Sequence, residues 1–484
     1  MSKPELLFVL LFFCFSCIKK VIPPSSVLPV PSEQQLVWHD MEQYAFVHFT
    51  TNTFTGKEWG YGDESPHVFN PTGMNTDQWA KTFKEAGFKG IILTCKHHDG
   101  FCLWPSAYSK HSVKMSKWKN GQGDVVKEVC ESCKKYGLKF GVYLSPWDRN
   151  RENYGSHSYI QYYRNQLHEL FTNYGPVFEM WFDLANGGDG YYGGANEKRT
   201  IKVPDYYDWP GTIDLVRNME SNILFFSDFG PDVRWCGNEK GFMGDPNWCM
   251  INSDSIYYGT LNNVRLNEYR HHGIEQGKQW VPAEVDVSIR PGWFYHASED
   301  SMVKTPEQLF DIYLNSVGRG ANLILNVPPD QRGLLHENDV QSLIGWKKLL
   351  DEAFSNNLAL NSKVKSSSCR GNARQFSARN VNDGNKETYW TTDNEILKGS
   401  IEFDFGRQQV VKYVVLQEYI RLGQRVSKFD IKVWKDNSWQ KADKGTTIGH
   451  KRIIKLKLQD STQKLRIDIE DSRACPMISN IEIY

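Results

Sequence analysis

The sequence predicts an α/β protein, a (β/α)8-like barrel followed by an all-β sandwich domain. From Gln34 to about Asn356, short apolar runs rich in branched and aromatic residues alternate with amphipathic segments, which amounts to close to eight strand–helix units. After Ala359 the helical period disappears, and short alternating runs separated by turn signals take over. A chain of 484 residues is long enough for both domains.

The expected barrel elements follow from these runs in chain order. Strands are expected at residues 44–49, 90–94, 139–144, 177–182, 223–227 and 322–326, with weaker ones near 248–251 and 282–287. Helices are expected at residues 76–86, 125–136, 160–174, 212–219, 306–319 and 338–354. No glycine-rich phosphate loop follows the first strand, which favours a closed barrel over an open doubly wound sheet.

The N-terminal residues resemble an export signal. Residues 6–16 form an apolar stretch that is too short to span a bilayer. It ends before Cys17, which resembles the acylated cysteine of bacterial lipoproteins; an ordinary cleaved signal is the alternative. We therefore expect a signal peptide over residues 1–17 and a Pro- and Ser-rich tether over residues 18–33. The protein is expected to be exported and lipid-anchored to a bacterial envelope membrane, in the periplasm or at the cell surface.

Composition narrows the function classes. Lys+Arg and Asp+Glu each total 57, and no basic run suggests nucleic acid as a partner. Aromatic residues make up 13% of the chain, which favours sugar binding, since pyranose rings stack on flat side chains. The ten cysteines show no spacing typical of a closed zinc site. Cys369 and Cys475 lie near the ends of the last domain, where an exported protein could bridge them.

Polar residues recur where the predicted strands end. They are His48, Lys96, His97, His98, Asp99, Tyr143, Ser145, Asp183, Ser227, Asp228, Glu284, Asp286 and Asn326. In a barrel these ends share one face, and catalytic side chains cluster there. Asp183 follows the buried run VFEMWF and is the candidate nucleophile; capping of the next turn is the alternative.

Two chemistries could use this set of residues. Histidines and an aspartate could hold a zinc ion that activates water. Two carboxylates could instead hydrolyse a glycosidic bond without a metal. The first strand lacks an alternate-residue His pair, and His97 and His98 are adjacent, which suits two hydroxyl contacts better than two ligands on one ion.

Four motifs together resemble the α-L-fucosidases of glycoside hydrolase family 29. They are FVHFT at residues 46–50, KEWGYG at 57–62, CKHHDGFCLW at 95–104 and WFDLA at 181–185. The resemblance spans about residues 34–356. It implies a barrel-like catalytic domain and a retaining double displacement in which Asp183 attacks the anomeric carbon of fucose, with no cofactor for catalysis.

The resemblance also implies an acid/base residue. RWCGNEKG at residues 234–241 is similar to a segment of the subfamily that favours α-1,3 and α-1,4 linkages, which points to Glu239; Cys236 stands where Val is usual. PAEVDVSIRPGWFYH at residues 282–296 is also similar to that subfamily and offers Glu284 as a rival. We expect Glu284 to be a substrate-binding or supporting carboxylate, with a structural pairing to Arg290 as the alternative.

Further contacts carry over by matched motif. The resemblance implies that His48, His97 and His98 hydrogen-bond fucose hydroxyls, that Glu58 and Trp59 reach the polar edge of the ring, that Tyr143 lies near the nucleophile, and that Trp293 faces the C5 methyl group. Arg290 is expected to order the site rather than touch the sugar.

The last domain, residues 360–484, shows its own signals. Strands are expected at residues 400–405, 411–417, 429–435, 452–458 and 464–470. NDGNKETYW at residues 382–390 and the closing ISNIEIY resemble the discoidin class of sandwich, which overlaps carbohydrate-binding module family 32. The resemblance implies a structural Ca²⁺ held by Asp383, Asn385, Thr388 and Glu482, a set of hard oxygen ligands. An ion-free Asp-Gly turn is the alternative.

Two main hypotheses follow. One is an exported retaining α-L-fucosidase that acts on fucosylated oligosaccharides or glycans. The other is a catalytically silent glycan-binding lipoprotein on the same scaffold. Because both Asp183 and Glu239 are present, the enzyme is favoured; a zinc hydrolase is the third possibility.

Overall fold

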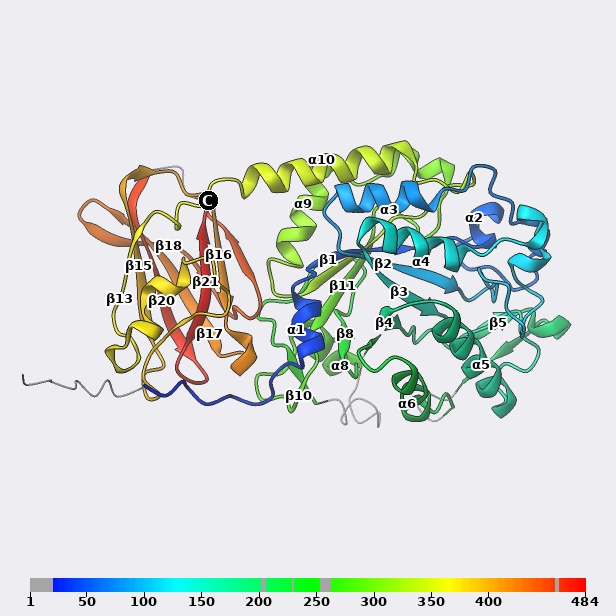
Figure 1. Cartoon of the computed structure of the whole chain (residues 1–484), viewed down its shortest axis with the longest axis horizontal. Coiled ribbons are helices and arrows are strands. Elements are labelled where there is room, and N and C mark those ends of the chain that lie inside the picture. The colour runs from blue at the N-terminus through cyan, green and yellow to red at the C-terminus, as the bar shows by residue number, and fades with distance from the viewer. Residues whose placement is uncertain (1–20, 202–205, 229, 253–262, 458–460) are drawn as a thin grey trace, which may run out of the picture.

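The computed structural model describes residues 21–201, 206–228, 230–252, 263–457 and 461–484 (Figure 1). The expected signal peptide, Cys17 and the first residues of the tether lie outside these ranges. Within them, no helix has the length and apolar character needed to cross a membrane.

Eight parallel strands close into the expected barrel in the order β1-β12-β11-β8-β7-β4-β3-β2. They are β1 (Gln43–Val47), β2 (Gly90–Lys96), β3 (Lys139–Leu144), β4 (Val177–Trp181), β7 (Leu224–Ser227), β8 (Val233–Trp235), β11 (Ala283–Ser288) and β12 (Asn322–Asn326). The (β/α)8-like fold class is confirmed.

Helices surround the barrel, and several begin with a side chain that caps the first turn. They are α1 (Glu33–His39), α2 (Thr51–Thr55), α3 (Thr76–Glu85), α4 (Val125–Tyr136), α5 (His157–Asn173), α6 (Trp209–Met219), α8 (Asn263–His272), α9 (Pro306–Asn315) and α10 (Glu337–Ala353). Asn75, Asp124 and Thr305 accept backbone N–H groups at the starts of α3, α4 and α9. These caps explain why the helix starts could be recognised from sequence.

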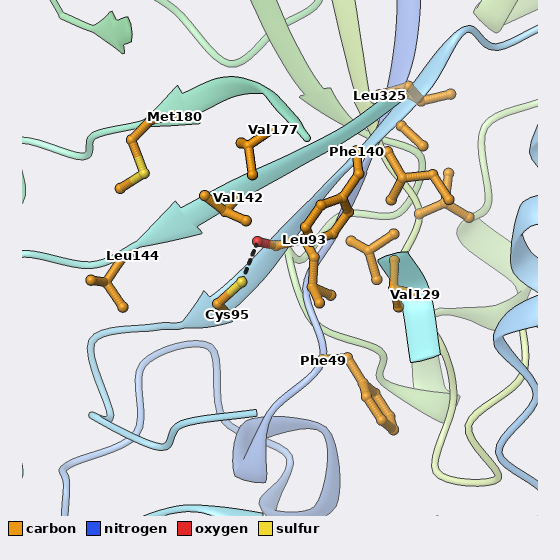
Figure 2. Close-up of a cluster of buried hydrophobic side chains, with 14 of the residues drawn as sticks. Phe49, Leu93, Cys95, Val129, Phe140, Val142, Leu144, Val177, Met180 and Leu325 are labelled. Atoms are coloured by element: carbon orange, nitrogen blue, oxygen red, sulfur yellow. Dashed lines mark hydrogen bonds between the residues drawn. The ribbon is translucent and has the colours of Figure 1, made fainter. Parts of the chain in front are cut away.

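Side-chain alternation along the strands divides the barrel into two cores. Outward-facing side chains such as Leu93, Val142 and Val177 pack with Val129 of α4 in one cluster (Figure 2). In the same view, the Cys95 thiol donates to the Leu93 carbonyl at 3.5 Å. Inward-facing aromatic residues form a second cluster inside the barrel; they include Tyr44, Phe46, Tyr143, Trp181 and Phe226. The inner cluster forms the base on which the polar strand ends stand.

The sixth barrel strand differs from the expectation. Residues 250–251 do form a strand, β9 (Met250–Ile251), but it pairs antiparallel with β10 (Gln279–Trp280) outside the barrel. The sixth position belongs to β8, which follows β7 after only a short turn and no helix. A three-residue strand without a crossover helix lacks the periodic signal on which the prediction relied.

The C-terminal domain is the expected antiparallel sandwich. One sheet has the order β13-β15-β20-β17-β18 and the other β14-β21-β16-β19. The strands are β13 (Lys363–Ser366), β14 (Trp390–Thr391), β15 (Gly399–Gln409), β16 (Tyr413–Glu418), β17 (Val426–Lys435), β18 (Ser438–Gly445), β19 (Arg452–Lys455), β20 (Thr462–Ser472) and β21 (Met477–Ile483). A separate two-stranded sheet joins β5 (Gly188–Gly190) to β6 (Glu197–Arg199) beside the barrel. The suggested bridge between Cys369 and Cys475 is wrong, since both are free thiols.

Residues 21–31, which we call the strap, are bound to the sandwich domain. The interpretation of residues 18–33 as a tether is therefore corrected for this part of the segment. The strap runs along the lower edge of the sandwich and leads into α1 (Figure 1). Its hydrogen bonds to the sandwich include Ile22 O with Arg370 Nε at 2.7 Å, Ser25 O with Arg425 Nη2 at 2.7 Å and Val27 N with Leu422 O at 2.9 Å. Pro24 and Pro31 are buried. Prolines suit this extended segment because they reduce the conformational freedom lost on docking.

A glycine tests the strap. A Cβ at Gly423 would meet the Val27 carbonyl oxygen at 2.1 Å, whereas a Cβ at Gly406 meets nothing within 4 Å. Both residues have positive φ, so an alanine at either site costs about 1–2 kcal/mol in backbone strain. We expect Gly423→Ala to cost about 1–2 kcal/mol more than Gly406→Ala, through displaced strap hydrogen bonds.

Thermal unfolding and limited proteolysis of the two variants check this prediction. Gly423→Ala should expose the strap to cleavage, and Gly406→Ala should not. Equal stability losses and equal cleavage would show that the strap is not held by this contact.

Candidate active site

The residues expected in the site come together at the carboxyl ends of the barrel strands. A chain of contacts links them: His48 and His97 rings at 5.4 Å, His97 and His98 rings at 4.0 Å, His98 Nε2 and Asp183 Oδ2 at 3.6 Å, and His48 and Trp293 rings at 5.3 Å. His48 follows β1, His97 and His98 follow β2, Asp183 follows β4, and Trp293 follows β11. Strands far apart in sequence thus place one group of side chains, as the barrel predicts.

Asp183 is held from two sides and remains accessible. Tyr143 Oη donates to Asp183 Oδ2 at 3.0 Å, and the Ala185 backbone N–H donates to Oδ1 at 2.7 Å. The Asp183 side chain is 27% exposed. An oriented, partly exposed carboxylate above an aromatic floor can attack a bound electrophile. The same backbone contact also makes Asp183 a turn cap, so the capping alternative is observed and the role of nucleophile stays a prediction.

The three histidines are uncharged hydrogen-bonding groups. His48 Nδ1 pairs with Asn326 Oδ1 at 2.8 Å, and His98 Nδ1 pairs with Ser145 Oγ at 2.7 Å. Burial lowers the pKa of His48 to about 3 and the pKa of His98 to about 4, and burial also places the pKa of His97 well below its usual value. Neutral imidazoles can hydrogen-bond ligand hydroxyls without carrying a buried charge.

Glu239 lies on the loop after β8, which only β7 separates from β4, the strand that leads to Asp183. Its Oε2 accepts from Trp293 Nε1 at 3.3 Å. Desolvation raises the pKa of Glu239; the Trp293 hydrogen bond opposes this, and the charges of Asp183 and Glu58 add to it. A raised pKa favours the protonated form of this carboxyl group, which is the form that a proton donor needs.

Glu58 and Trp59 occupy different places at the edge of the site. Glu58 Oε2 accepts from the Trp293 backbone N–H at 2.7 Å, and Oε1 contacts His296 Nε2 at 2.6 Å, so Glu58 positions the Trp293 loop. Its side chain is still 39% exposed. Trp59 is 54% exposed, with its ring edge-on to His98 at 5.3 Å. Both side chains have surface left for a ligand.

Glu284 does not line the site. It has no exposed surface, and its carboxylate accepts from Tyr44 Oη and, at 2.8 Å, from Trp181 Nε1 inside the barrel. The prediction that Glu284 contacts the substrate is therefore wrong, because a ligand cannot reach this side chain in the present conformation. It does not pair with Arg290 either: that guanidinium binds Asp300 and Asp339.

The residues suggested for calcium lie apart from the site, in the sandwich. Asp383 Oδ1 accepts from Asn385 N at 2.8 Å, and Thr388 Oγ1 donates to Asp383 Oδ2 at 2.7 Å. Glu482 accepts from Asn480 and Tyr484. The donors are oxygens that suit Ca²⁺, but hydrogen bonds already engage all three carboxyl and hydroxyl side chains, and calcium stays a prediction. Among the described residues, no three His, Cys, Asp or Glu side chains form a group able to hold a metal ion.

Several further residues stand beside the site, and one of them, Arg270, was missed by sequence reasoning. Trp235 Nε1 donates to Asp286 Oδ1 at 2.7 Å, and Arg270 lies over the Trp235 ring at 5.2 Å and pairs with Asp228. Asp286 is buried next to the charge of Glu239, and its pKa is raised well above the usual value, mainly by burial. Asp228 and Asp286 belong to the polar residues that recur at the ends of the predicted strands. Arg270 lies on α8, outside every motif that was recognised in the sequence.

The neutral histidines predict a pH effect on stability. In the unfolded chain His98 has a pKa of about 6.5, so it takes up a proton as the pH falls below that value while the folded protein does not. The free energy of unfolding should therefore fall between pH 6.5 and the folded pKa of about 4, by about 1–2 kcal/mol at pH 5 from this residue.

Denaturant unfolding of His98→Asn at pH 7 and pH 5 checks this sign. The variant should lose less stability on acidification than the parent protein. His168→Asn, which changes an exposed imidazole on α5, serves as the matched control. An unaltered pH dependence in His98→Asn would contradict a neutral buried imidazole.

Comparison with known proteins places both domains in known families. A family model for "Alpha-L-fucosidase" matches residues 24–353, and a model for "NedA-like, galactose-binding domain" matches residues 380–467. Alpha-L-fucosidase 1 of Arabidopsis thaliana is 40% identical over 467 residues, which covers 95% of this chain and 88% of the plant protein.

Solved structures show the same similarity. A putative α-L-fucosidase from Bacteroides thetaiotaomicron superposes with a TM-score of 0.87 and 37% identity, covering 96% of this chain and 99% of the other. A Ruminococcus gnavus family 29 fucosidase in complex with fucose has a TM-score of 0.84 and 31% identity, with 96% of each chain covered. The chain therefore belongs to the α-L-fucosidases of glycoside hydrolase family 29, and it is a glycoside hydrolase with a galactose-binding type of sandwich at its C-terminus.

Proposed function

We propose that this protein is an exported, retaining α-L-fucosidase that removes terminal α-1,3- or α-1,4-linked fucose from glycans. The observation that carries the proposal is the pair of carboxyl groups at the pocket: an oriented Asp183, and a Glu239 whose pKa is raised by desolvation and by the charge of Asp183. Retaining glycosidases need one carboxylate as nucleophile and one carboxylic acid as proton donor.

In the first step Asp183 Oδ attacks the anomeric carbon of fucose, and the bond to the aglycone oxygen breaks. Tyr143 and the Ala185 N–H orient the attacking carboxylate. Glu239 transfers its proton to the departing oxygen, so the aglycone leaves as a neutral alcohol. The product is a fucosyl ester on Asp183.

In the second step Glu239, now ionised, takes a proton from water, and the water oxygen attacks the anomeric carbon. The ester bond breaks, Asp183 returns as a carboxylate and Glu239 as an acid. Two displacements at one carbon restore its configuration. Glu284 cannot replace Glu239 as the acid/base, since it has no exposed surface through which to reach an aglycone.

The pocket suits a 6-deoxy sugar. His48, His97 and His98 supply neutral imidazoles, and the Trp293 ring, 5.3 Å from that of His48, supplies an adjacent apolar surface. Three hydroxyls beside one methyl group match this division between polar and apolar walls. Glu58 and Trp59 stand at the rim, where an exposed carboxylate and ring can complete the contacts.

The proposed linkage preference rests on the two segments that are similar to the α-1,3/1,4 subfamily. One supplies Glu239 and the other supplies Trp293, and the hydrogen bond between these side chains joins the segments beside the aglycone. A preference for branched glycans would be encoded in this paired loop structure.

The first experiment compares hydrolysis of Lewis-type fucosylated trisaccharides and an aryl α-L-fucoside, with chelator present. Asp183→Ala should lose activity on both substrates by at least about 10⁴-fold, because the nucleophile is gone. Glu239→Gln should lose about 10²–10⁴-fold on the trisaccharides and far less on an aryl fucoside whose leaving group needs no proton. Glu131→Gln, on the exposed side of α4, is the control.

Two readouts separate the alternatives. The first sugar released should be α-fucose by NMR if the reaction retains configuration. Activity of the parent protein should fall as the pH rises through the pKa of Glu239, and this basic limb should disappear in Glu239→Gln. An inactive parent protein would favour the silent glycan-binding alternative, and activity abolished by chelator would favour zinc.

We also propose that Cys17 carries a lipid that anchors the protein to a bacterial envelope membrane, on the basis of the sequence pattern alone. Labelling with a fatty acid during expression should mark the parent protein and place it in the membrane fraction. Cys17→Ala should lose the label and leave the membrane, whereas Cys14→Ala should keep both. A labelled Cys17→Ala variant would contradict the anchor.

A further inference from the structure

Two carboxyl groups that take no part in the proposed mechanism lie inside the barrel. Glu179 on β4 and Glu284 on β11 both have no exposed surface. Glu284 precedes the end of its strand by four residues, which at about 3.3 Å per residue is roughly 13 Å below the rim. Within the described part of the chain, neither carboxyl group has a Lys, Arg or His partner.

The hydroxyl of Tyr44 stands between the two carboxyl groups. It donates to Glu284 Oε2 and lies 3.2 Å from Glu179 Oε2. Trp38 Nε1 adds a donor shared between Tyr44 Oη at 2.9 Å and Glu179 Oε2 at 3.0 Å. The Tyr44 hydroxyl has one proton, so it can donate to only one carboxyl group.

A proton on Glu179 resolves this arrangement. Two ionised carboxylates with no exposed surface, and with no cationic partner among the described residues, would repel each other, and both would be poorly solvated. With Glu179 protonated, its O–H can donate to Glu284, with which it shares a side-chain hydrogen bond, or to Tyr44 Oη, and Tyr44 donates to Glu284 Oε2. Glu284 then has two donors, Tyr44 Oη and Trp181 Nε1, one for each oxygen. The hydrogen bonds therefore assign the proton to Glu179 and the charge to Glu284.

Trp181 connects this pair to the site. It lies two residues before Asp183 on the same chain, so both side chains face the barrel interior. Its ring stacks on Phe226 at 4.1 Å and meets Tyr143 edge-on at 5.5 Å. Tyr143 in turn donates to Asp183. The one polar contact of the indole, Trp181 Nε1 to Glu284 Oε1, fixes the rotation of this ring.

We propose that Glu284 is a positioning residue of the fucosidase: as the ionised member of an acid–carboxylate pair with Glu179, it holds Trp181, and through Tyr143 it holds the nucleophile in place. The role presupposes Asp183 as the nucleophile, as proposed above. Glu284 acts on the reaction without touching substrate.

Conservative amide variants test the assignment of the proton. Glu179→Gln replaces a neutral acid with a neutral amide that can still donate to Tyr44, and kcat on the aryl fucoside should fall less than threefold. Glu284→Gln offers one acceptor oxygen to two donors and turns an NH₂ group toward one of them. Its kcat should fall at least tenfold with a KM change of less than threefold.

A double-mutant cycle separates positioning from general structural support. Trp181→Phe removes the N–H that Glu284 accepts, so adding Glu284→Gln to this variant should cause less than a threefold further loss in kcat. If the losses in kcat of Trp181→Phe and Glu284→Gln multiply in full in the double variant, the proposal is overturned. A Glu179→Gln variant that loses as much kcat as Glu284→Gln would overturn it as well.

Infrared spectroscopy keeps the test decisive if an amide variant is poorly folded. The parent protein should show a protonated buried carboxyl C=O band that is missing in Glu179→Gln and kept in Glu284→Gln. A parent protein without the band would overturn the shared-proton pair. Full activity in Asp183→Ala would instead refute the proposed nucleophile, which is a separate outcome.

Discussion

The structure depends on one geometric constraint, the alternation of side chains along eight strands that close on themselves. Outward-facing residues must fit the helices, and inward-facing residues must fill the barrel without water. The residues that follow the carboxyl ends of the strands are under neither demand, and there Asp183 stands partly exposed beside the buried imidazoles of His48 and His98. The polar site and the aromatic interior are consequences of the same alternation, because site residues such as His48 and Asp183 follow the inward-facing Phe46 and Trp181 by two residues.

This constraint explains why much of the site could be predicted from the sequence. Asp183 follows a buried run that ends at a fixed place, and a residue at the end of such a run in a parallel barrel has few positions to occupy. The histidine pair after β2 is placed by the same rule. The motif containing Glu239 could be recognised although its own strand was not, because the motif lies in the loop and the strand has only three residues.

Other features could not be predicted, for identifiable physical reasons. Glu284 and Asp286 lie two residues apart on β11, so their side chains point to the same face of the strand. The sequence alone does not tell how deep in the barrel each of them lies. The glutamate within VFEMW was a usable signal, since a carboxylate inside an apolar run demands a partner, yet the partners Tyr44 and Glu284 come from distant strands. The strap was taken for a tether because prolines occur both in free linkers and in docked extended segments.

The strap and the chain after α10 join the sandwich to the barrel at two separate edges (Figure 1). A single covalent connection acts as a hinge, whereas two connections on opposite edges resist rotation about either one. Further contacts such as Ile453 N to Gly318 O at 2.9 Å lie between them. Rigid-body opening of the two domains is therefore opposed by both connections. Local movement of the loops at the barrel mouth, among them those that carry Glu239 and Trp293, breaks none of these contacts between the domains.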